Sequence, residues 1–226
     1  MIIRENYLKK IVDAKDTEFI KVITGIRGSG KSTLLLMFRD YLKDHNVQDD
    51  QIIYINFESA MYDDIKNYKD LYQYVKEKIK DQRIYLLLDE VQNVEAWEKA
   101  INSFKVDFDI DIYITASNAY LLSSELSTLL SGRYIEIKMY PLSFKEFLLF
   151  NHYDHDDLEN KFYEYLKYGG LPAITLIKDN DELVLSYLND IYNSIVKKDI
   201  INKVSANLKG QIEKRAEDIK YAIESK

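Results

Sequence analysis

The feature that most constrains this chain is the octapeptide GIRGSGKS at residues 25–32, which follows the largely apolar run FIKVIT at 19–24. A glycine, four residues, a second glycine, lysine and serine is the spacing of a loop that wraps phosphate groups. Such a loop connects a strand to a helix, and here a strand is expected at 19–24 and a helix at 31–44. The segment therefore predicts a nucleotide-binding α/β domain.

The residues of this glycine loop have distinct expected roles. Glycines allow backbone N–H groups to turn toward phosphate oxygens, and the helix that follows points its positive end at the same charge. Lys31 is expected on the β- and γ-phosphates, and the Ser32 hydroxyl is expected to ligate magnesium. The predicted nucleotide-binding residues are Gly25, Arg27, Gly28, Ser29, Gly30, Lys31, Ser32 and Thr33.

A second motif, IYLLLDEVQ at 84–92, ends an apolar run in two carboxylates. A strand ending in Asp89 places a carboxylate beside the loop, where it holds magnesium through water. Glu90 then orients and polarises the attacking water. The alternative is an acidic strand end that faces solvent. Together with the glycine loop, the pair favours hydrolysis over binding alone, because holding ATP requires no carboxylate at position 90.

Two further segments carry candidate catalytic side chains. In ITASNAYLL at 114–122, the polar residues Thr115, Ser117 and Asn118 lie at the C-terminal end of the fourth strand, at the edge where ligands bind in parallel sheets. Such a side chain contacts the γ-phosphate or the attacking water, or else caps the next helix. In SGRYIEI, Arg133 lies near the sheet edge, where it either completes a neighbouring subunit's site or forms a surface ion pair. The predicted catalytic residues are Lys31, Glu90, Asn118 and Arg133.

The strand pattern indicates the fold class. Several strand candidates are apolar almost without alternation, which is typical of parallel strands covered on both faces by helices. We therefore expect an α/β fold: a three-layer P-loop NTPase domain over residues 1–140 with a central, mostly parallel five-stranded sheet. The order along the chain suits the division of NTPases in which an extra strand separates the loop strand from the Asp89 strand. The expected strands are 19–24, 52–57, 84–89, 110–115 and 134–138, and the expected helices are 31–44, 69–81, 94–104 and 119–130.

A small helical region, 141–226, is expected to follow as a lid or as the start of a second domain. Ser143 and Glu146 form a capping box that begins a helix at 143–151. A helix at 156–168 runs into Gly169 and Gly170, a natural stop. Further helices are expected at 181–198 and 205–225, and a weak strand pattern lies at LPAITLI, 171–177.

Composition restricts the class of protein. The 226 residues include no cysteine, which excludes disulfides and thiolate metal sites and favours an intracellular location. The net charge of −7 argues against a protein whose main role is to grip nucleic acid, although a local basic patch remains compatible with it. No segment resembles a membrane span or a signal peptide, so a cytoplasmic location is expected. His152 and His155 are expected in a solvated helix connection rather than at a metal site.

Four segments together resemble a known family: ITGIRGSGKSTLL, LLLDEVQNVEAW, ITASNAYLLSSELSTLLSGRYIEIKMYPLSFKEFL and YLKYGGLPAI. They are similar to the prokaryotic AAA-type ATPases that carry an uncharacterised C-terminal domain, over about Arg4 to Asp199. The resemblance implies ATP as the nucleotide, magnesium as cofactor, and the roles given above for Lys31, Ser32, Asp89, Glu90 and Arg133. Members continue into a winged-helix-like piece and a further domain, so the resemblance implies that this C-terminal part is missing here.

Three functions follow as hypotheses. The first is magnesium-dependent ATP hydrolysis that drives a conformational change in an unknown protein client, with Arg133 shared between subunits of a homo-oligomer. The second is an ATP-dependent binding switch with little turnover, which has no need of Glu90. The third is a DNA-associated ATPase, favoured by Lys197, Lys198 and Lys203 and opposed by the acidic balance.

Overall fold

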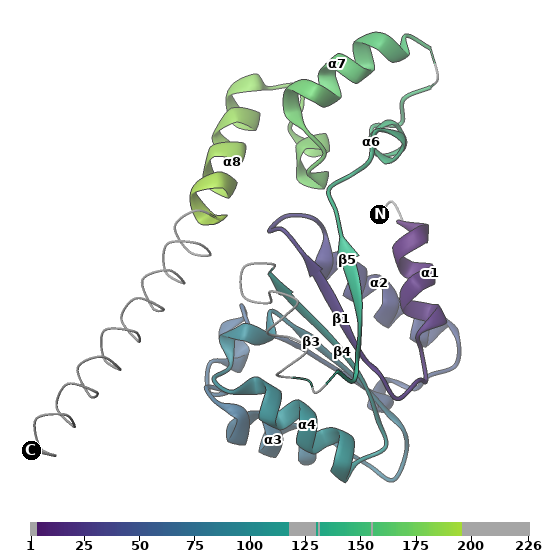
Figure 1. Ribbon diagram of the computed structural model, residues 1–226, viewed down its shortest axis with the longest axis vertical. Coiled ribbons are helices and arrows are strands. Elements are labelled where there is room, and N and C mark those ends of the chain that lie inside the picture. The colour runs from purple at the N-terminus through teal and green to yellow at the C-terminus, as the bar shows by residue number, and fades with distance from the viewer. Residues whose placement is uncertain (1–3, 118–129, 131, 155, 196–226) are drawn as a thin grey trace, which may run out of the picture. The chain divides into compact units, whose positions relative to one another are not determined.

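The computed structural model describes residues 4–117, 130, 132–154 and 156–195 (Figure 1). The chain divides into two compact units, Met1–Lys178 and Asp179–Lys226. The first unit contains the sheet, the helices that cover it and a helical segment from residue 141 onward. In the second unit the structure describes one helix, α8. No helix of these described ranges is both long and apolar enough to cross a membrane.

A five-stranded sheet in the order β2-β3-β4-β1-β5 forms the centre of the first unit. All four strand pairs are parallel, so the expected parallel α/β fold is confirmed. The separation of β1 from β3 is confirmed too, and β4 is the strand between them. The bounds are β1 Ile20–Gly25, β2 Ile52–Asn56, β3 Ile84–Asp89, β4 Ile110–Ser117 and β5 Tyr134–Met139.

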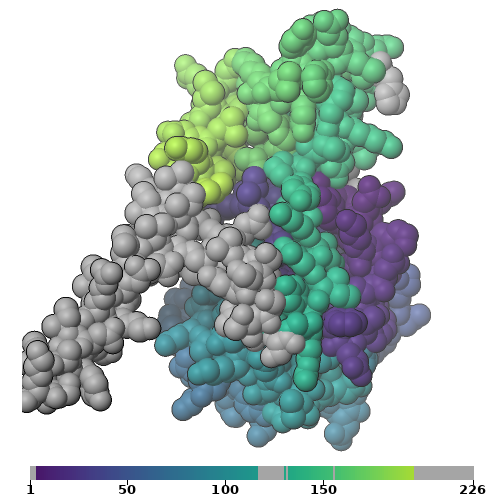
Figure 2. Space-filling view, viewed as in Figure 1, coloured from purple at the N-terminus to yellow at the C-terminus, as the bar shows by residue number. Residues whose placement is uncertain are grey.

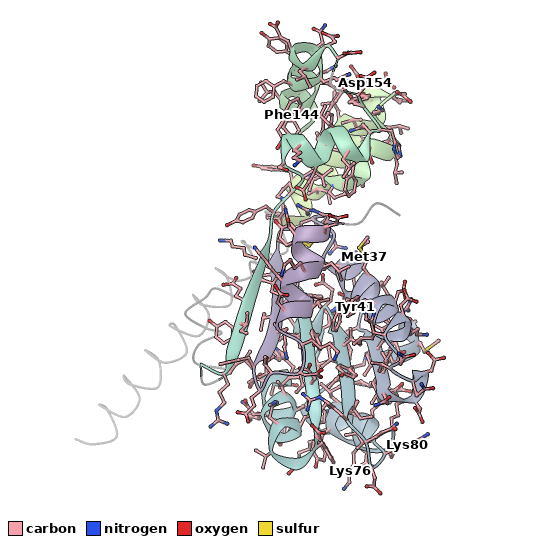
Figure 3. All side chains as sticks on the ribbon, turned by 90° about the vertical axis from the view of Figure 1, so that its right-hand side faces the viewer. Met37, Tyr41, Lys76, Lys80, Phe144 and Asp154 are labelled. Carbon is pink, nitrogen blue, oxygen red and sulfur yellow. The ribbon has the colours of Figure 1, made fainter. Side chains whose placement is uncertain are left out.

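Helices cover both faces of the sheet, as Figure 1 shows. On one face, α1 and α2 pack against side chains such as Ile23 and Leu87. On the other, α3 and α4 pack against Val22 and Leu86. Neighbouring strand residues therefore enter opposite cores, which explains why the strands are apolar almost without alternation. These helices are α1 Glu5–Asp13, α2 Lys31–Asp44, α3 Tyr68–Lys76 and α4 Trp97–Asp107, and Figure 3 labels Met37 and Tyr41 on α2.

Two helix boundaries differ from expectation. The helix expected at 69–81 ends at Lys76, and Ile79 packs against the core from beyond its end. The helix expected at 94–104 begins only at Trp97, because Val91–Asn93 form the 3-10 helix η3 and Ala96 takes a left-handed conformation with φ of +54°. Two further 3-10 turns, η1 Asp49–Gln51 and η2 Ala60–Tyr62, flank β2.

The helical segment, residues 141–178, contains α6 Phe144–Phe150 and α7 Leu158–Tyr168. Ser143 accepts a hydrogen bond from the Glu146 backbone, which confirms the capping box. Gly169 ends α7 with φ of +77°. At Gly170 a Cβ atom would lie 2.3 Å from the carbonyl oxygen of Leu142, so only glycine permits this close approach. Aromatic rings pack between the two helices, among them Phe144, labelled in Figure 3, and Phe162.

The weak strand expected at 171–177 is wrong. Pro172–Leu176 form the 3-10 helix η4, with Pro172 in its first turn. Proline has no backbone N–H to give to a sheet and suits the start of a helical turn instead. In the second unit, α8 spans Asp181–Ser194 and is capped by the Asn180 side chain. The helices expected at 119–130 and 205–225 lie outside the described residues, apart from Leu130.

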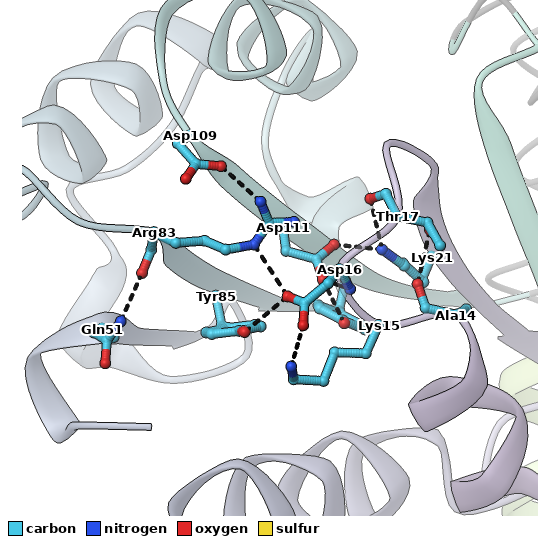
Figure 4. Close-up of polar contacts among 11 residues, drawn as sticks. Ala14, Lys15, Asp16, Thr17, Lys21, Gln51, Arg83, Tyr85, Asp109 and Asp111 are labelled. Atoms are coloured by element: carbon cyan, nitrogen blue, oxygen red, sulfur yellow. Dashed lines mark hydrogen bonds and ion pairs between the residues drawn. The ribbon is translucent and has the colours of Figure 1, made fainter. Parts of the chain in front are cut away.

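A buried polar network lies at the edge of the sheet where the strands begin (Figure 4). Lys21 of β1 and Asp111 of β4 form an ion pair whose side chains are both fully buried. The Tyr113 hydroxyl donates to Asp111 at 2.7 Å, and the Asp16 backbone N–H donates to it at 2.8 Å. Burial lowers the pKa of Lys21, and the hydrogen bond to Asp111 opposes that shift. Nearer the surface, Arg83 pairs with Asp16 and Asp109.

Candidate nucleotide-binding site

The glycine loop joins β1 to α2, as its spacing predicts. Gly28 and Gly30 take φ values of +80° and +97°, which favour glycine. At Gly25 a Cβ atom would lie 2.4 Å from the Met139 carbonyl oxygen and 2.8 Å from the Ser29 hydroxyl oxygen. The loop therefore turns tightly against the end of β5 and requires glycine at each of these positions.

Lys31 is buried at the first position of α2. Its Nζ atom donates to the carbonyl oxygens of Gly25 at 3.2 Å and Ile26 at 3.4 Å. It also lies 3.7 Å from a carboxylate oxygen of Glu90. The ammonium group is thus held inside the curve of the loop, where phosphate oxygens are stronger partners than carbonyl groups.

The Ser29 hydroxyl is buried in the same loop and has no hydrogen-bond partner among the described residues. A buried hydroxyl without a partner costs about 1–3 kcal/mol. A phosphate oxygen in the curve of the loop would relieve that cost. The loop therefore fits a phosphate-bearing ligand by its shape, its cation and its unpaired donor.

Asp89 ends β3 and is fully buried. It accepts hydrogen bonds from Ser32 at 3.0 Å, from Thr115 on β4, and from the Tyr54 hydroxyl at 3.3 Å. Burial raises the pKa of Asp89, although the bonds from Thr115 and Ser32 partly oppose that rise. A hydroxyl beside a carboxylate is the kind of oxygen pair that magnesium prefers, so the two predicted metal ligands are brought together.

Glu90 follows in a left-handed conformation with φ of +56°, which is uncommon for a residue with a side chain. Its backbone N–H donates to the Thr115 hydroxyl at 2.9 Å. Its carboxylate lies beside Lys31 and accepts a hydrogen bond from the Gln92 side chain. This conformation turns the chain from the end of β3 into η3.

Two further side chains contact the acidic residues. Thr115, one of three polar candidates at the end of β4, bonds to both Asp89 and Glu90, whereas the sequence motifs did not indicate Tyr54. Tyr54 lies on β2, and burial beside Asp89 raises the pKa of Tyr54 to about 12. The available signal was alternation in IIYIN, which places Tyr54 on the same face of the sheet as Ile52, the face that packs toward α2.

Among the other predicted site residues, Arg27 lies in the loop itself, whereas Arg133 lies at the opposite edge of the sheet. Asn118 lies outside the described residues, as does the side chain of Ser117. Arg27 is exposed and pairs with Glu58 at 3.3 Å. Arg133 is exposed at the beginning of β5, whereas Met139 at the end of the same strand pairs with Gly25. Six residues of strand place Arg133 about 20 Å from the loop.

A small apolar cavity of about 90 Å³ adjoins the loop and the start of α2. A second, open cavity of about 700 Å³ lies at the opposite edge of the sheet and includes Arg133. Within the described part of the chain, no group of three or more histidine, cysteine or acidic residues forms a metal cluster. His152 lies in the turn after α6, and His155 is not among the residues described. The small cavity is lined by Arg4, Gly30, Thr33, Leu34, Met37, Met139, Phe150 and Pro172.

Comparisons with known proteins agree with this geometry. Residues 17–148 match the family described as AAA domain. An uncharacterized protein of Haemophilus influenzae is 49% identical over 207 residues, which cover 90% of this chain and 51% of that protein. The Walker-type ATPase PABY2304 of Pyrococcus abyssi has a similar fold, with a TM-score of 0.53, 16% identity, and coverage of 97% of this chain and 76% of the other.

The AMPPCP-bound DnaA of Aquifex aeolicus is similar in fold as well, with a TM-score of 0.50 and 18% identity, over 88% of this chain and 66% of that one. Both solved structures share the arrangement of the sheet and its helices with this chain. The chain spans about half the length of the curated relatives it matches.

Proposed function

Because this chain belongs to the family of AAA domains and has the P-loop NTPase fold, we propose that it binds ATP with magnesium and hydrolyses it. The observation that carries the proposal is the convergence of four side chains at one edge of the sheet. Ser32 contacts Asp89, and Lys31 lies beside Glu90. Two of these residues come from the loop after β1 and two from the end of β3.

The loop supports phosphate binding by residues 25–33. Its backbone N–H groups and the start of α2 present positive charge, and Lys31 supplies a full cation. On phosphate binding, Lys31 exchanges its bonds to the Gly25 and Ile26 carbonyl groups for bonds to the β- and γ-phosphate oxygens. The Ser29 hydroxyl gains its missing partner.

The apolar cavity beside α2 supports a base such as adenine. Its walls include Leu34, Met37 and Met139, which offer apolar contact to a flat ring. The Met37 side chain is flexible enough to adjust to such a ring. A volume of about 90 Å³ is small, so Met37 and Phe150 must move apart to admit the base.

The oxygen pair of Ser32 and Asp89 supports magnesium, which supplies charge neutralisation between the β- and γ-phosphates when it is bound. In the hydrolytic step, Glu90 accepts a proton from the water whose oxygen forms a bond to the γ-phosphorus. The bond from that phosphorus to the β–γ bridging oxygen breaks, and ADP and phosphate leave. Thr115 holds the Glu90 backbone and the Asp89 carboxylate in place, because its hydroxyl bonds to both.

We further propose that residues 1–140 act as the ATPase core and that the helices from residue 141 act as a lid. Hydrolysis would move this lid, and the movement would act on an unknown protein client. Asn118 and Arg133 belong to this proposal as residues that contact the γ-phosphate. Arg133 does so in a neighbouring subunit, since it lies at the far edge of its own sheet.

The test compares the parent protein with Lys31→Ala and Glu90→Gln. Lys31→Ala removes the cation from the loop, so ATP affinity should fall at least tenfold, as measured by nucleotide titration with magnesium present. Lys43→Ala, at the other end of the same helix, is the matched control and should bind as the parent does. Equal affinities for the parent and Lys31→Ala would overturn the assignment of the loop.

Glu90→Gln keeps the size of the side chain and removes its charge, so it should bind ATP normally and slow single-turnover hydrolysis by about 10²–10⁴-fold. Glu95→Gln, an exposed residue just beyond η3, is the control. Unchanged hydrolysis in Glu90→Gln would favour the ATP-dependent binding switch, in which the contacts of Glu90 with Lys31 and Gln92 are structural only.

A further inference from the structure

Arg4 lies behind the glycine loop and bridges it to the helical segment. Its side chain is only 5% exposed. One guanidinium nitrogen, Nη1, donates to the carbonyl oxygens of Ser29 at 3.2 Å and Tyr140 at 2.7 Å. Nε and Nη2 donate to the two carboxylate oxygens of Glu146 at 2.8 and 3.1 Å. One side chain therefore contacts the loop, the end of β5 and α6.

The backbone at Arg4 is fixed as firmly as its side chain. Its carbonyl oxygen accepts from the N–H groups of Tyr7 and Leu8, which begin α1. The Tyr7 ring lies under the guanidinium carbon, 4.4 Å from it, and the Tyr7 hydroxyl accepts from the Tyr140 N–H. Figure 2 shows α1 in purple packed against β5 in teal. Arg4 is thus held against the sheet and has little freedom to move without its partners.

The carboxylate of Glu146 takes part in both the capping box of α6 and the ion pair with Arg4. It accepts from the backbone and hydroxyl of Ser143, which begin α6, and from Arg4. The first turn of α6 is therefore attached directly to the guanidinium that holds the loop carbonyl. Just before α6, the Leu142 N–H donates to the carbonyl oxygen of Gly170, which follows the end of α7.

Building on the proposed function, we propose that Arg4 is a positioning residue that couples the glycine loop to the helical segment. A guanidinium bound to the Ser29 carbonyl polarises the peptide that continues into the Gly30 N–H, which strengthens that N–H as a donor to phosphate. The coupling also runs in the opposite direction. When phosphate binding shifts Ser29, Arg4 shifts with it and, through Glu146, moves the first turn of α6. Lysine cannot replace it, because these contacts need the planar fork of arginine.

The test compares Arg4→Lys and Glu146→Gln with the parent. Arg83→Lys is the matched control, since the Arg83 guanidinium also binds carboxylate groups, those of Asp16 and Asp109, but does so at the opposite edge of the sheet. The probe is AMPPNP with magnesium. Affinity is measured by titration, and hydrogen exchange is followed separately for the amides of the loop, 25–33, and of α6.

In the parent, AMPPNP should slow exchange in the loop and in α6. Glu146→Gln should keep the affinity within about threefold, because the loop contact of Arg4 remains. The slowing of exchange in α6 should be lost, because the ion pair that joins α6 to Arg4 is removed. Arg4→Lys should weaken binding by about tenfold, the size of one charge-assisted hydrogen bond, and lose the slowing in α6. Arg83→Lys should lower thermal stability and leave both nucleotide responses unchanged.

Slowing of α6 in Glu146→Gln equal to that in the parent would overturn the coupling, as would parental affinity in Arg4→Lys. Slowing in the loop of the parent without any in α6 would reject the coupling alone and leave the proposed function standing. No protection of the loop in the parent would reject both. If Arg4→Lys does not fold, the Glu146→Gln comparison still decides the coupling, because that variant keeps the contacts of Arg4 to Ser29 and Tyr140.

Discussion

The hydroxyl of Ser32 lies 3.0 Å from a carboxylate oxygen of Asp89, across 57 residues of sequence. Asp89 ends β3, Ser32 lies in the first turn of α2 just after β1, and β4 lies between those two strands in the sheet. They meet because parallel strands present their carboxyl ends at the same edge. The pair therefore unites two separate sequence motifs into one site.

Asp89→Asn should separate the contribution of this carboxylate to metal binding from the stability that is lost by burying its charge. Burial raises the pKa of Asp89, so the ionised group is held at some expense of stability while no cation is bound. Asparagine keeps an acceptor for Ser32 and Thr115 and removes the charge. The metal-free variant should melt at a temperature equal to or about 2–4 °C above the parent, and stabilisation by magnesium with ATP should disappear in thermal melts. A variant that magnesium with ATP stabilises as it does the parent would show that Asp89 does not bind the metal.

Lys21→Met should be strongly destabilising. The change leaves the Asp111 carboxylate buried without its cation, which typically costs about 3–5 kcal/mol. The double variant Lys21→Met, Asp111→Asn removes both charges and should recover at least half of that loss in urea unfolding. Lys15→Met is the control: its partner Asp16 is partly exposed, so the loss should stay near about 1 kcal/mol. Additive losses in the double variant would show that the two side chains do not depend on each other.

The sequence predicted the residues of contiguous motifs better than the residues that meet only in the folded chain. The contiguous motifs predicted the loop, Asp89 and Glu90, because glycine, lysine and paired acidic residues carry a recognisable spacing, and the structure brings these residues together. Thr115 was among the polar candidates as well, but its bonds to Asp89 and Glu90 depend on the fold. Arg4 contacts Ser29 across 25 positions of sequence, and no local pattern distinguishes it from an ordinary surface residue.

The fold was predicted from strand periodicity to within about two residues at each strand end. Buried Lys21 is an unusual residue within those strands: a lysine in an apolar run is accommodated because Asp111 of β4 forms an ion pair with it. Helix limits were less predictable, since Ala96 and Glu90 adopt left-handed conformations that tertiary contacts impose. The strand at 171–177 was wrong because Pro172 favours a helical turn.

Trp97→Ala should destabilise the first unit without altering nucleotide affinity. Trp97 is 6% exposed and belongs to the core formed by α4 with Ile101 and Phe104. Truncation leaves a cavity and should lower the free energy of unfolding by about 3–5 kcal/mol. Val106→Ala, on the exposed face of the same helix, should change it little. Parental stability together with altered nucleotide binding would instead place Trp97 at a ligand.

Glu146 should make stability depend on pH in a defined window. Burial raises its pKa, but hydrogen bonds from Arg4 and Ser143 outweigh burial, so the pKa lies below its ordinary value of 4.5. A carboxyl with a lowered pKa contributes stability that is fully present above that ordinary value and is lost as the pH falls through the folded pKa. At neutral pH, the free energy of unfolding of the parent should exceed that of Glu146→Gln by about 1–3 kcal/mol. In urea unfolding this difference should shrink as the pH falls below 4.5; a difference constant with pH would contradict the ion pair.

Arg133 should act on a neighbouring subunit. It is exposed at the edge where β5 begins, whereas the loop of its own chain lies where β5 ends. Lys31→Ala should bind ATP at least tenfold more weakly while still presenting Arg133, and Arg133→Ala should bind ATP while lacking the arginine. Each variant alone should be slow, because an arginine at the transferred phosphate is worth about 10³–10⁵-fold in rate.

Mixing the two variants should restore part of the ATPase activity, since a mixed oligomer contains sites with an intact loop from one chain and Arg133 from the other. The recovery should rise with total protein concentration, because it depends on association. Mixing Arg133→Ala with the double variant Lys31→Ala, Arg133→Ala supplies no arginine and should restore nothing, which excludes simple stabilisation by added protein. If mixed oligomers form and activity does not return, then Arg133 does not complete a partner's site, and the cavity beside it has another role.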